Sequence, residues 1–239
     1  MRSTANQILL AATMIAGSVC LSNCSRPLCT PNEADGQLRY SASNPGFGDI
    51  DVFAACLEAG GNPNSVVETG DYMNGWTPLL LTAYGGFGDA TRQRNDSIWN
   101  GASLEQIRLL LEHGADLQAR TPEGENAVYL SAVAGRVPLI EFFLSKGLPV
   151  DEVTITGKTP LFGSITYGRT DVVELLLKRG ANPNHISAER ESVLDYAEGI
   201  LRAAEHSGTV SAPGYEPARV IEILKRNGAK TAQELGRAP

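Results

Sequence analysis

The sequence predicts an all-α solenoid of about five stacked helix pairs, joined by β-turn finger loops and interrupted by two inter-helix insertions. The first observation is a fixed period, because Gly114, Gly147 and Gly180 are evenly spaced (147 minus 114 and 180 minus 147 are both 33). The second is a marker within each period: Gly124 and Gly157 each precede the next of these glycines by the same interval (147 minus 124 and 180 minus 157 are both 23). A fixed period of about 20 to 50 residues is typical of a stacked repeat array.

The most regular repeat shows why each unit is predicted to be a pair of helices. Thr159 is placed to cap a short helix that begins at Pro160, where the missing N–H is harmless and φ is already helical. A second helix is predicted from about Thr170 to Arg179, with one apolar stripe and a basic last turn. Gly180 can then adopt the left-handed conformation that ends a helix.

This segment resembles the ankyrin repeat. The resemblance rests on Thr159-Pro160-Leu161, Val172-Val173, Leu175 to Leu177 and Gly180-Ala181-Asn182, which fall at the spacing of that family. It implies the fold far more directly than the function, because one fold hosts many functions. The family's usual histidine in the first helix is absent, and its position is occupied by Leu80, Tyr129, Phe162 and Asp195.

Residues 1–23 are interpreted as an export signal that is not part of the fold. Arg2 gives the segment a positive start, and the apolar run from Ile8 to Val19 is too short to span a bilayer comfortably. The alternative is a short amphipathic or membrane-anchoring segment. The protein is therefore expected to be exported, to the periplasm or as a membrane-anchored lipoprotein of a Gram-negative-type bacterium.

The end of this segment leaves two kinds of processing open. Leu21-Ser22-Asn23-Cys24 resembles a bacterial lipoprotein box, which implies that Cys24 becomes the lipidated first residue. Asn23 departs from the small residue usually found before that cysteine, so simple cleavage in the region of Gly17 to Asn23 is the alternative. Membrane contact is expected only through this lipid.

The cysteines cluster near the start of the chain, at positions 20, 24, 29 and 56. If Cys20 leaves with the signal and Cys24 carries lipid, Cys29 and Cys56 remain as a pair. A disulfide between them would tie an N-terminal tether, residues 24–31, to the first repeat and would stabilise the fold by roughly 3 kcal/mol. The alternative is that Cys56 is only a small core hydrophobe. No histidine or acidic cluster accompanies these cysteines, so no metal site is predicted.

The repeat domain is predicted to span residues 32–239. Its repeats are expected at about 32–64, 65–118, 119–151, 152–184 and 185–232. In the first of them, helices are predicted from Asn32 to Ala42 and from Asp49 onward, and its divergence is typical of a capping repeat. The polar tail that leads to Pro239 is expected to be loose.

The second and fifth repeats are longer than the period. The interval from Gly60 to Gly114 exceeds the period by 21 (114 minus 60 is 33 plus 21): five of the extra residues are assigned to the finger loop 65–74 and sixteen to the segment 85–102 between the helices. After it, Ser103 is predicted to begin a helix with a capping box. The segment carries Trp99, which is predicted to contact a partner or, alternatively, to cover its own repeat. Fifteen more extra residues fall near 199–216.

No catalytic, cofactor or nucleic-acid site is predicted. Gly157-Lys158-Thr159 lacks the earlier glycine of a phosphate-binding loop, because Glu152 stands in its place. The histidines at 113, 185 and 206 fall in different repeats without ligand spacing, and no nucleophile elbow is present. The net charge of −7 and the absence of a basic stripe argue against nucleic acid as a partner.

The resemblance implies a protein partner, held by the finger loops and the ends of the first helices on a concave face. Carried onto this chain, those positions are Met73, Asn74, Trp76, Tyr84, Glu123, Glu125, Val133, Ile155, Thr156, Lys158, Thr166, Tyr167, Glu189 and Glu191. Large, rigid side chains contribute most at such contacts, so Trp76, Tyr84, Ile155 and Tyr167 are the expected anchors. The alternative is that some of them merely cover the neighbouring repeat.

The leading hypothesis is a monomeric, exported interaction protein of the cell envelope. One version of it is an inhibitory or protective partner of an envelope-acting toxin or enzyme. The second hypothesis is an effector that leaves the cell and binds host proteins. A distant third is an enzyme with its site in the 85–102 insertion.

Overall fold

The structure is a computed structural model, and it describes residues 29–43, 50–68, 73–85, 97–207 and 216–236. The predicted export signal, Cys24 and most of the predicted tether lie outside the described residues, as do the parts of the two insertions at 86–96 and 208–215. The fold is therefore described from Cys29 onward.

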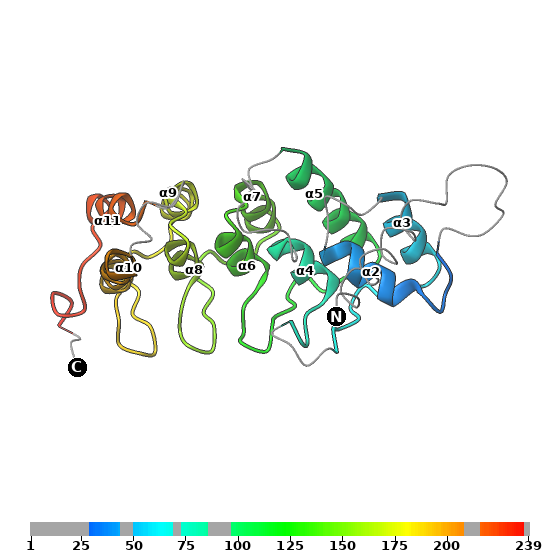
Figure 1. Cartoon of the computed structure of the whole chain (residues 1–239), viewed down its shortest axis with the longest axis horizontal. Helices are drawn as coiled ribbons and strands as arrows, with labels where there is room; N and C mark the ends of the chain where they lie inside the picture. Colours follow the sequence, from blue (N-terminus) through cyan, green and yellow to red (C-terminus); the bar gives the residue numbers. More distant parts are fainter. Residues whose placement is uncertain (1–28, 44–49, 69–72, 86–96, 208–215, 237–239) are drawn as a thin grey trace, which may run out of the picture.

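The described chain is all-α, and its helices form two layers (Figure 1). The first helices of the repeats make up one layer: α2 (Ala34–Ser43), α4 (Pro78–Tyr84), α6 (Ala127–Ala134), α8 (Pro160–Thr166) and α10 (Val193–Ser207). The second helices make up the other: α3 (Ile50–Glu58), α5 (Ser97–Glu112), α7 (Val137–Ser145), α9 (Thr170–Lys178) and α11 (Pro217–Arg226). Each helix packs against its own pair mate and against the matching helix of the next repeat. The predicted helix-pair solenoid is confirmed.

The glycines that set the period end the second helices as predicted. They all have φ between +80° and +92°, in the left-handed region: Gly60, Gly114, Gly147, Gly180 and Gly228. The residue after each glycine donates its N–H to the carbonyl five residues earlier, as Ala181 does to Leu176 (2.9 Å). This hydrogen bond satisfies a helix-end carbonyl, and it explains why a residue without a Cβ recurs at this position.

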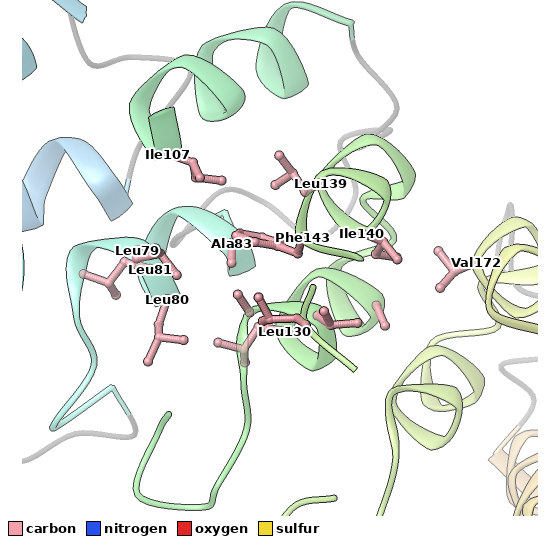
Figure 2. Close-up of a cluster of buried hydrophobic side chains, with 14 of the residues drawn as sticks. Leu79, Leu80, Leu81, Ala83, Ile107, Leu130, Leu139, Ile140, Phe143 and Val172 are labelled. Atoms are coloured by element: carbon pink, nitrogen blue, oxygen red, sulfur yellow. The ribbon is translucent and has the colours of Figure 1, made fainter. Parts of the chain in front are cut away.

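A continuous apolar core lies between the two layers (Figure 2). Leu130 of α6 and Phe143 of α7 lie in it with neighbours from the preceding and following repeats, and both are almost fully buried. Because no helix pair can bury its apolar face alone, each repeat is stabilised by the next.

A disulfide closes the N-terminal end of the array. Cys29 is bonded to Cys56 of α3, with Cα atoms 5.0 Å apart and a sequence separation of 27. Cys56 is also fully buried, so it contributes to the core as well as to the cross-link.

The predicted start of the helix after the first insertion was wrong. α5 begins at Ser97, six residues before the expected capping box at Ser103. Ser103 is instead buried inside the helix, where its hydroxyl accepts a hydrogen bond from the guanidinium of Arg136. The same guanidinium donates to the carbonyl of Thr82 (2.9 Å) and to Asn100 Oδ1 (3.2 Å). A pattern typical of a helix start thus serves to bind an arginine of the next repeat.

Two smaller predictions also need correction. Thr159 occupies the N-cap position of α8, but its hydroxyl makes no capping hydrogen bond, so the fixed φ of Pro160 and the burial of α8 define the start. The tail is not loose over its described part, because the N–H of Ala232 donates to Asp195 Oδ2 at 2.7 Å. Ser192 donates to the same carboxylate oxygen, and these bonds hold the pKa of Asp195 below its usual range although burial alone would raise it.

Candidate partner-binding face

The finger loops project from the layer of first helices, side by side (Figure 1). In the three regular fingers, the N–H of the first residue donates to the carbonyl of the fifth: Thr121 to Glu125, Thr154 to Lys158 and Ser187 to Glu191, at 2.9 to 3.0 Å. In the preceding finger the matching bond runs from Val67 to Trp76, nine residues apart instead of four (76 minus 67, 125 minus 121). The five extra residues predicted for that finger are confirmed.

Neighbouring fingers are joined through their backbones. Ile155 donates its N–H to the carbonyl of Glu123 (2.9 Å), and Ala188 donates to that of Thr156 (3.0 Å). These bonds fix the fingers as one continuous surface. We call the fingers and the adjoining sides of α4, α6, α8 and α10 the finger face.

Burial removes two of the predicted contact residues from the finger face. Met73 is 1% exposed and Trp76 is 4% exposed, so neither is available to a partner. Trp76 packs edge-on against Tyr84 of α4, with ring centroids 5.5 Å apart. Trp76 thus packs within its own repeat, whereas the alternative stated for these residues was that they cover the neighbouring repeat. Asn74, in the same finger, is exposed, and Tyr84 is half-buried.

The other predicted residues whose side chains the structure describes remain at least partly exposed. Ile155 at a finger tip is 74% exposed, and Tyr167 at the end of α8 is 48% exposed. Glu123 and Glu189 are exposed at finger tips, whereas Glu125 and Lys158 are half-buried. Trp99 lies in the first turn of α5, and its side chain lies outside what the structure describes.

Two tyrosines that the sequence interpretation did not include also line this face. Tyr129 of α6 packs against α8 at Gly163, where an added Cβ would lie 3.4 Å from Tyr129 Cζ. Tyr196 of α10 hydrogen-bonds through its hydroxyl to Thr166 Oγ1 (2.9 Å). Burial raises the pKa of the Tyr129 phenol, and the nearby Glu125 carboxylate raises it further. Their only signal in the sequence is an aromatic residue in the first helix at or beside the family's histidine position.

Two carboxylates of the finger face are partly removed from water. Burial raises the pKa of Glu125; the hydroxyl of Thr121 offsets part of this effect, and the neighbouring Glu123 adds to it. Burial also raises the pKa of Glu191, which Lys158 partly offsets. Lys158 lies 3.3 Å from Glu189 and 4.7 Å from the centre of the Tyr196 ring. The face therefore combines exposed apolar groups, tyrosines and carboxylates.

The described residues contain no group of three or more histidine, cysteine, aspartate or glutamate side chains that could hold a metal ion. Within the same parts of the chain, every helix is too short or too polar to cross a membrane. His185 lies with Nε2 2.9 Å from the carbonyl oxygen of Gly157, so it links two fingers.

Part of the chain matches a known protein family. The family described as ankyrin repeats, in three copies, matches residues 96–187, which hold α5 to α9 and the regular fingers at 121–125 and 154–158. No curated protein matches the sequence. The residues matched are those that build the central part of the finger face.

Proposed function

Because this chain is an ankyrin-repeat protein, and such repeats are generally protein–protein interaction modules, we propose that it binds another protein through its finger face. Repeats of this family typically act as non-enzymatic scaffolds. The face would therefore recognise a partner rather than catalyse a reaction.

One observation carries this proposal: Ile155 and Tyr167, both in the fourth repeat, expose 74% and 48% of their surfaces. A helix-pair repeat needs its large apolar groups in the core, and the same repeat fully buries Phe162 and Leu176. Exposed isoleucine and tyrosine beside a rim of carboxylates are typical of a binding surface.

A pull-down from cell-envelope extracts tests the proposal. Wild-type protein is compared with the Ile155→Asp/Tyr167→Ala variant, which replaces the two exposed groups without removing a core side chain. We expect the partner to be lost or reduced at least about tenfold, since truncation of an interface anchor costs about 2 kcal/mol.

Tyr40→Ala is the matched control, because Tyr40 is 61% exposed on α2, at the other end of the array. It should recover the partner as wild type does. Equal recovery by the wild-type chain and by the Ile155→Asp/Tyr167→Ala variant would remove the finger face from the proposal.

We further propose that the protein is exported and that its partner is an envelope-acting protein, which it inhibits or protects. The disulfide between Cys29 and Cys56 supports export, since such bonds persist in oxidising compartments. The mass of the mature N-terminus tests this: lipidated Cys24 and simple cleavage give different masses, and an intact Met1 would contradict export.

A further inference from the structure

We propose that the partner presents a short basic segment to the finger face, with a lysine or arginine between Glu123 and Glu125 and apolar neighbours on Ile155 and Tyr167. The inference deepens the proposed function and rests on it. The inference rests on a comparison of two fingers of the same chain. Both hold glutamates at the same positions, but only one of them has a lysine beside its glutamates.

The finger at 121–125 and the finger at 187–191 carry matching carboxylates. Glu123 and Glu125 precede Glu189 and Glu191 by two repeat periods (189 minus 123 and 191 minus 125 are both twice 33). Both fingers close with the same backbone hydrogen bond, so the carboxylates start from equivalent backbone positions. We call 121–125 the open finger and 187–191 the filled finger.

In the filled finger the chain supplies its own cation. Lys158, from the finger before it, lies 3.3 Å from Glu189 and over the ring of Tyr196 at 4.7 Å. Its side chain is 19% exposed, so neighbouring residues cover most of it. The molecule therefore already holds one lysine that pairs with a finger carboxylate and lies over a tyrosine ring.

In the open finger no such cation is present among the described residues. The position that Lys158 occupies is held, in the finger before the open one, by Trp76, which is buried against Tyr84. Neither Glu123 nor Glu125 forms an ion pair with another described residue, whereas Arg120 of the same loop pairs with Glu152 (2.8 Å). Burial and mutual repulsion raise the pKa of Glu125, so a cation supplied from outside would relieve an unfavourable charge.

Apolar and aromatic groups surround these carboxylates. Ile155 is hydrogen-bonded through its N–H to the carbonyl of Glu123, which places its exposed side chain beside the open finger. Tyr129 lies close enough to Glu125 and Tyr167 for their charges to affect its pKa. A lysine or arginine stem can cover such apolar groups while its charged end meets the carboxylates. This mixed surface favours a basic segment with apolar residues over an acidic one.

Selection from a random peptide library displayed on phage tests the inference, with the mature full-length protein as bait. Wild-type protein should enrich lysine and arginine at least about threefold over the unselected library. The charge-reversed variant Glu123→Lys/Glu125→Lys should enrich aspartate and glutamate instead. The best wild-type peptide should bind Glu123→Gln/Glu125→Gln roughly tenfold more weakly, the scale of two partly exposed ion pairs.

Glu112→Gln/Glu222→Gln is the matched control, because it makes the same change in net charge at exposed residues of α5 and α11. It should change the affinity by less than about twofold. Circular dichroism and thermal unfolding of each variant establish that the fold is retained.

The outcomes separate the inference from the function on which it rests. Peptides without basic enrichment that still need Ile155 and Tyr167 would overturn the basic partner and leave the finger face as the binding surface. Peptides that bind independently of Ile155, Tyr167 and the two glutamates would overturn both. Recovery of no specific peptide would also overturn the inference, because a short basic segment is what it requires.

Discussion

The open finger and the filled finger differ in what lies beside them rather than in their own acidic residues. The carboxylates of Glu189 and Glu191 have Lys158 next to them, whereas those of Glu123 and Glu125 have no cation among their described neighbours. The residue that makes the difference is one position in the preceding finger, Lys158 in one case and Trp76 in the other. Whether the carboxylates of a finger have a cation beside them thus depends on a residue of the preceding repeat.

The same two fingers also differ at the turn. Gly124 has φ +81°, and a Cβ added to it would lie 3.2 Å from the backbone nitrogen of Ile155 in the next finger. Two periods later Arg190 has φ +63°, and it is the single non-glycine residue with positive φ in the described parts of the chain. Arg190 is exposed, and among the described residues no further finger of the regular kind follows 187–191. We infer that this turn position needs glycine where another finger packs against it, and that the last finger can hold a larger residue there.

The largest effect is expected when the stacked glycine is given a side chain. Gly124→Ala should lower the free energy of unfolding by about 2 kcal/mol, since a left-handed non-glycine residue costs about 1–2 kcal/mol and the new methyl group also crowds Ile155. Gly180→Ala is the control: its φ is +90°, but a Cβ there has nothing within 4 Å. It should lose only about 1 kcal/mol in urea denaturation. Equal losses at both positions would mean that finger stacking adds nothing to the requirement for glycine.

A smaller effect of opposite sign is expected at the last finger. Arg190→Gly should be more stable than Arg190→Ala by about 1 kcal/mol, because glycine adopts the left-handed conformation without strain. Both substitutions remove the same charge, so their difference isolates the backbone conformation. Thermal or urea unfolding measures it. If Arg190→Ala is the more stable of the two, the left-handed backbone at this position is not strained.

The sequence predicted the fold well because the period is set by positions where the backbone conformation requires glycine. A glycine that must take φ near +90° cannot be replaced cheaply, so the fixed spacing of Gly114, Gly147 and Gly180 located the helix ends. The start of α5 was missed, because Ser103 is placed like a helix cap but hydrogen-bonds Arg136 from another repeat. Such contacts depend on three-dimensional neighbours and leave no local pattern.

The binding face was harder to predict than the fold, and for a related reason. Trp76 is a residue type common at interfaces, but here it is buried and packs against Tyr84, which lies at the end of the helix that follows it. The open state of Glu123 and Glu125 depends in turn on the residue at position 76 in another repeat. The type of a residue indicates that it could contact a partner, but whether its side chain is exposed depends on how it packs in the folded protein.

Removing the internal cation should convert the filled finger into an open one. In Lys158→Met the pKa of Glu191 should rise, because Lys158 now stabilises its ionised form. The pH titration of the Glu191 carboxyl carbon by NMR measures this shift. Lys225→Met is the control, since Lys225 of α11 pairs with Glu198 of α10 (3.0 Å) and should leave Glu191 unchanged. An unmoved titration in Lys158→Met would remove the distinction between the two fingers.

The smallest effect tests whether the open carboxylates serve the fold or a partner. Burial raises the pKa of Glu125, so the folded chain takes up a proton at this site more readily than the unfolded chain does. Ionised Glu125 therefore lowers stability above that pKa, and the loss disappears as the pH falls through it. Glu125→Gln should accordingly raise the free energy of unfolding at pH 7 by about 0.3–0.5 kcal/mol, with no gain in acid.

The sign of that change matters more than its size. If a carboxylate stabilises the fold, neutralising it should lower the free energy of unfolding. This is expected for Asp195, whose pKa is lowered by hydrogen bonds from Ala232 and Ser192. If a carboxylate serves a basic partner instead, neutralising it should raise the free energy of unfolding of the free protein and weaken its binding to the partner. Glu125→Gln should move unfolding and peptide binding in opposite directions. If stability and peptide binding both decrease, Glu125 stabilises the fold, and the lack of a cation beside it is not evidence for a basic partner.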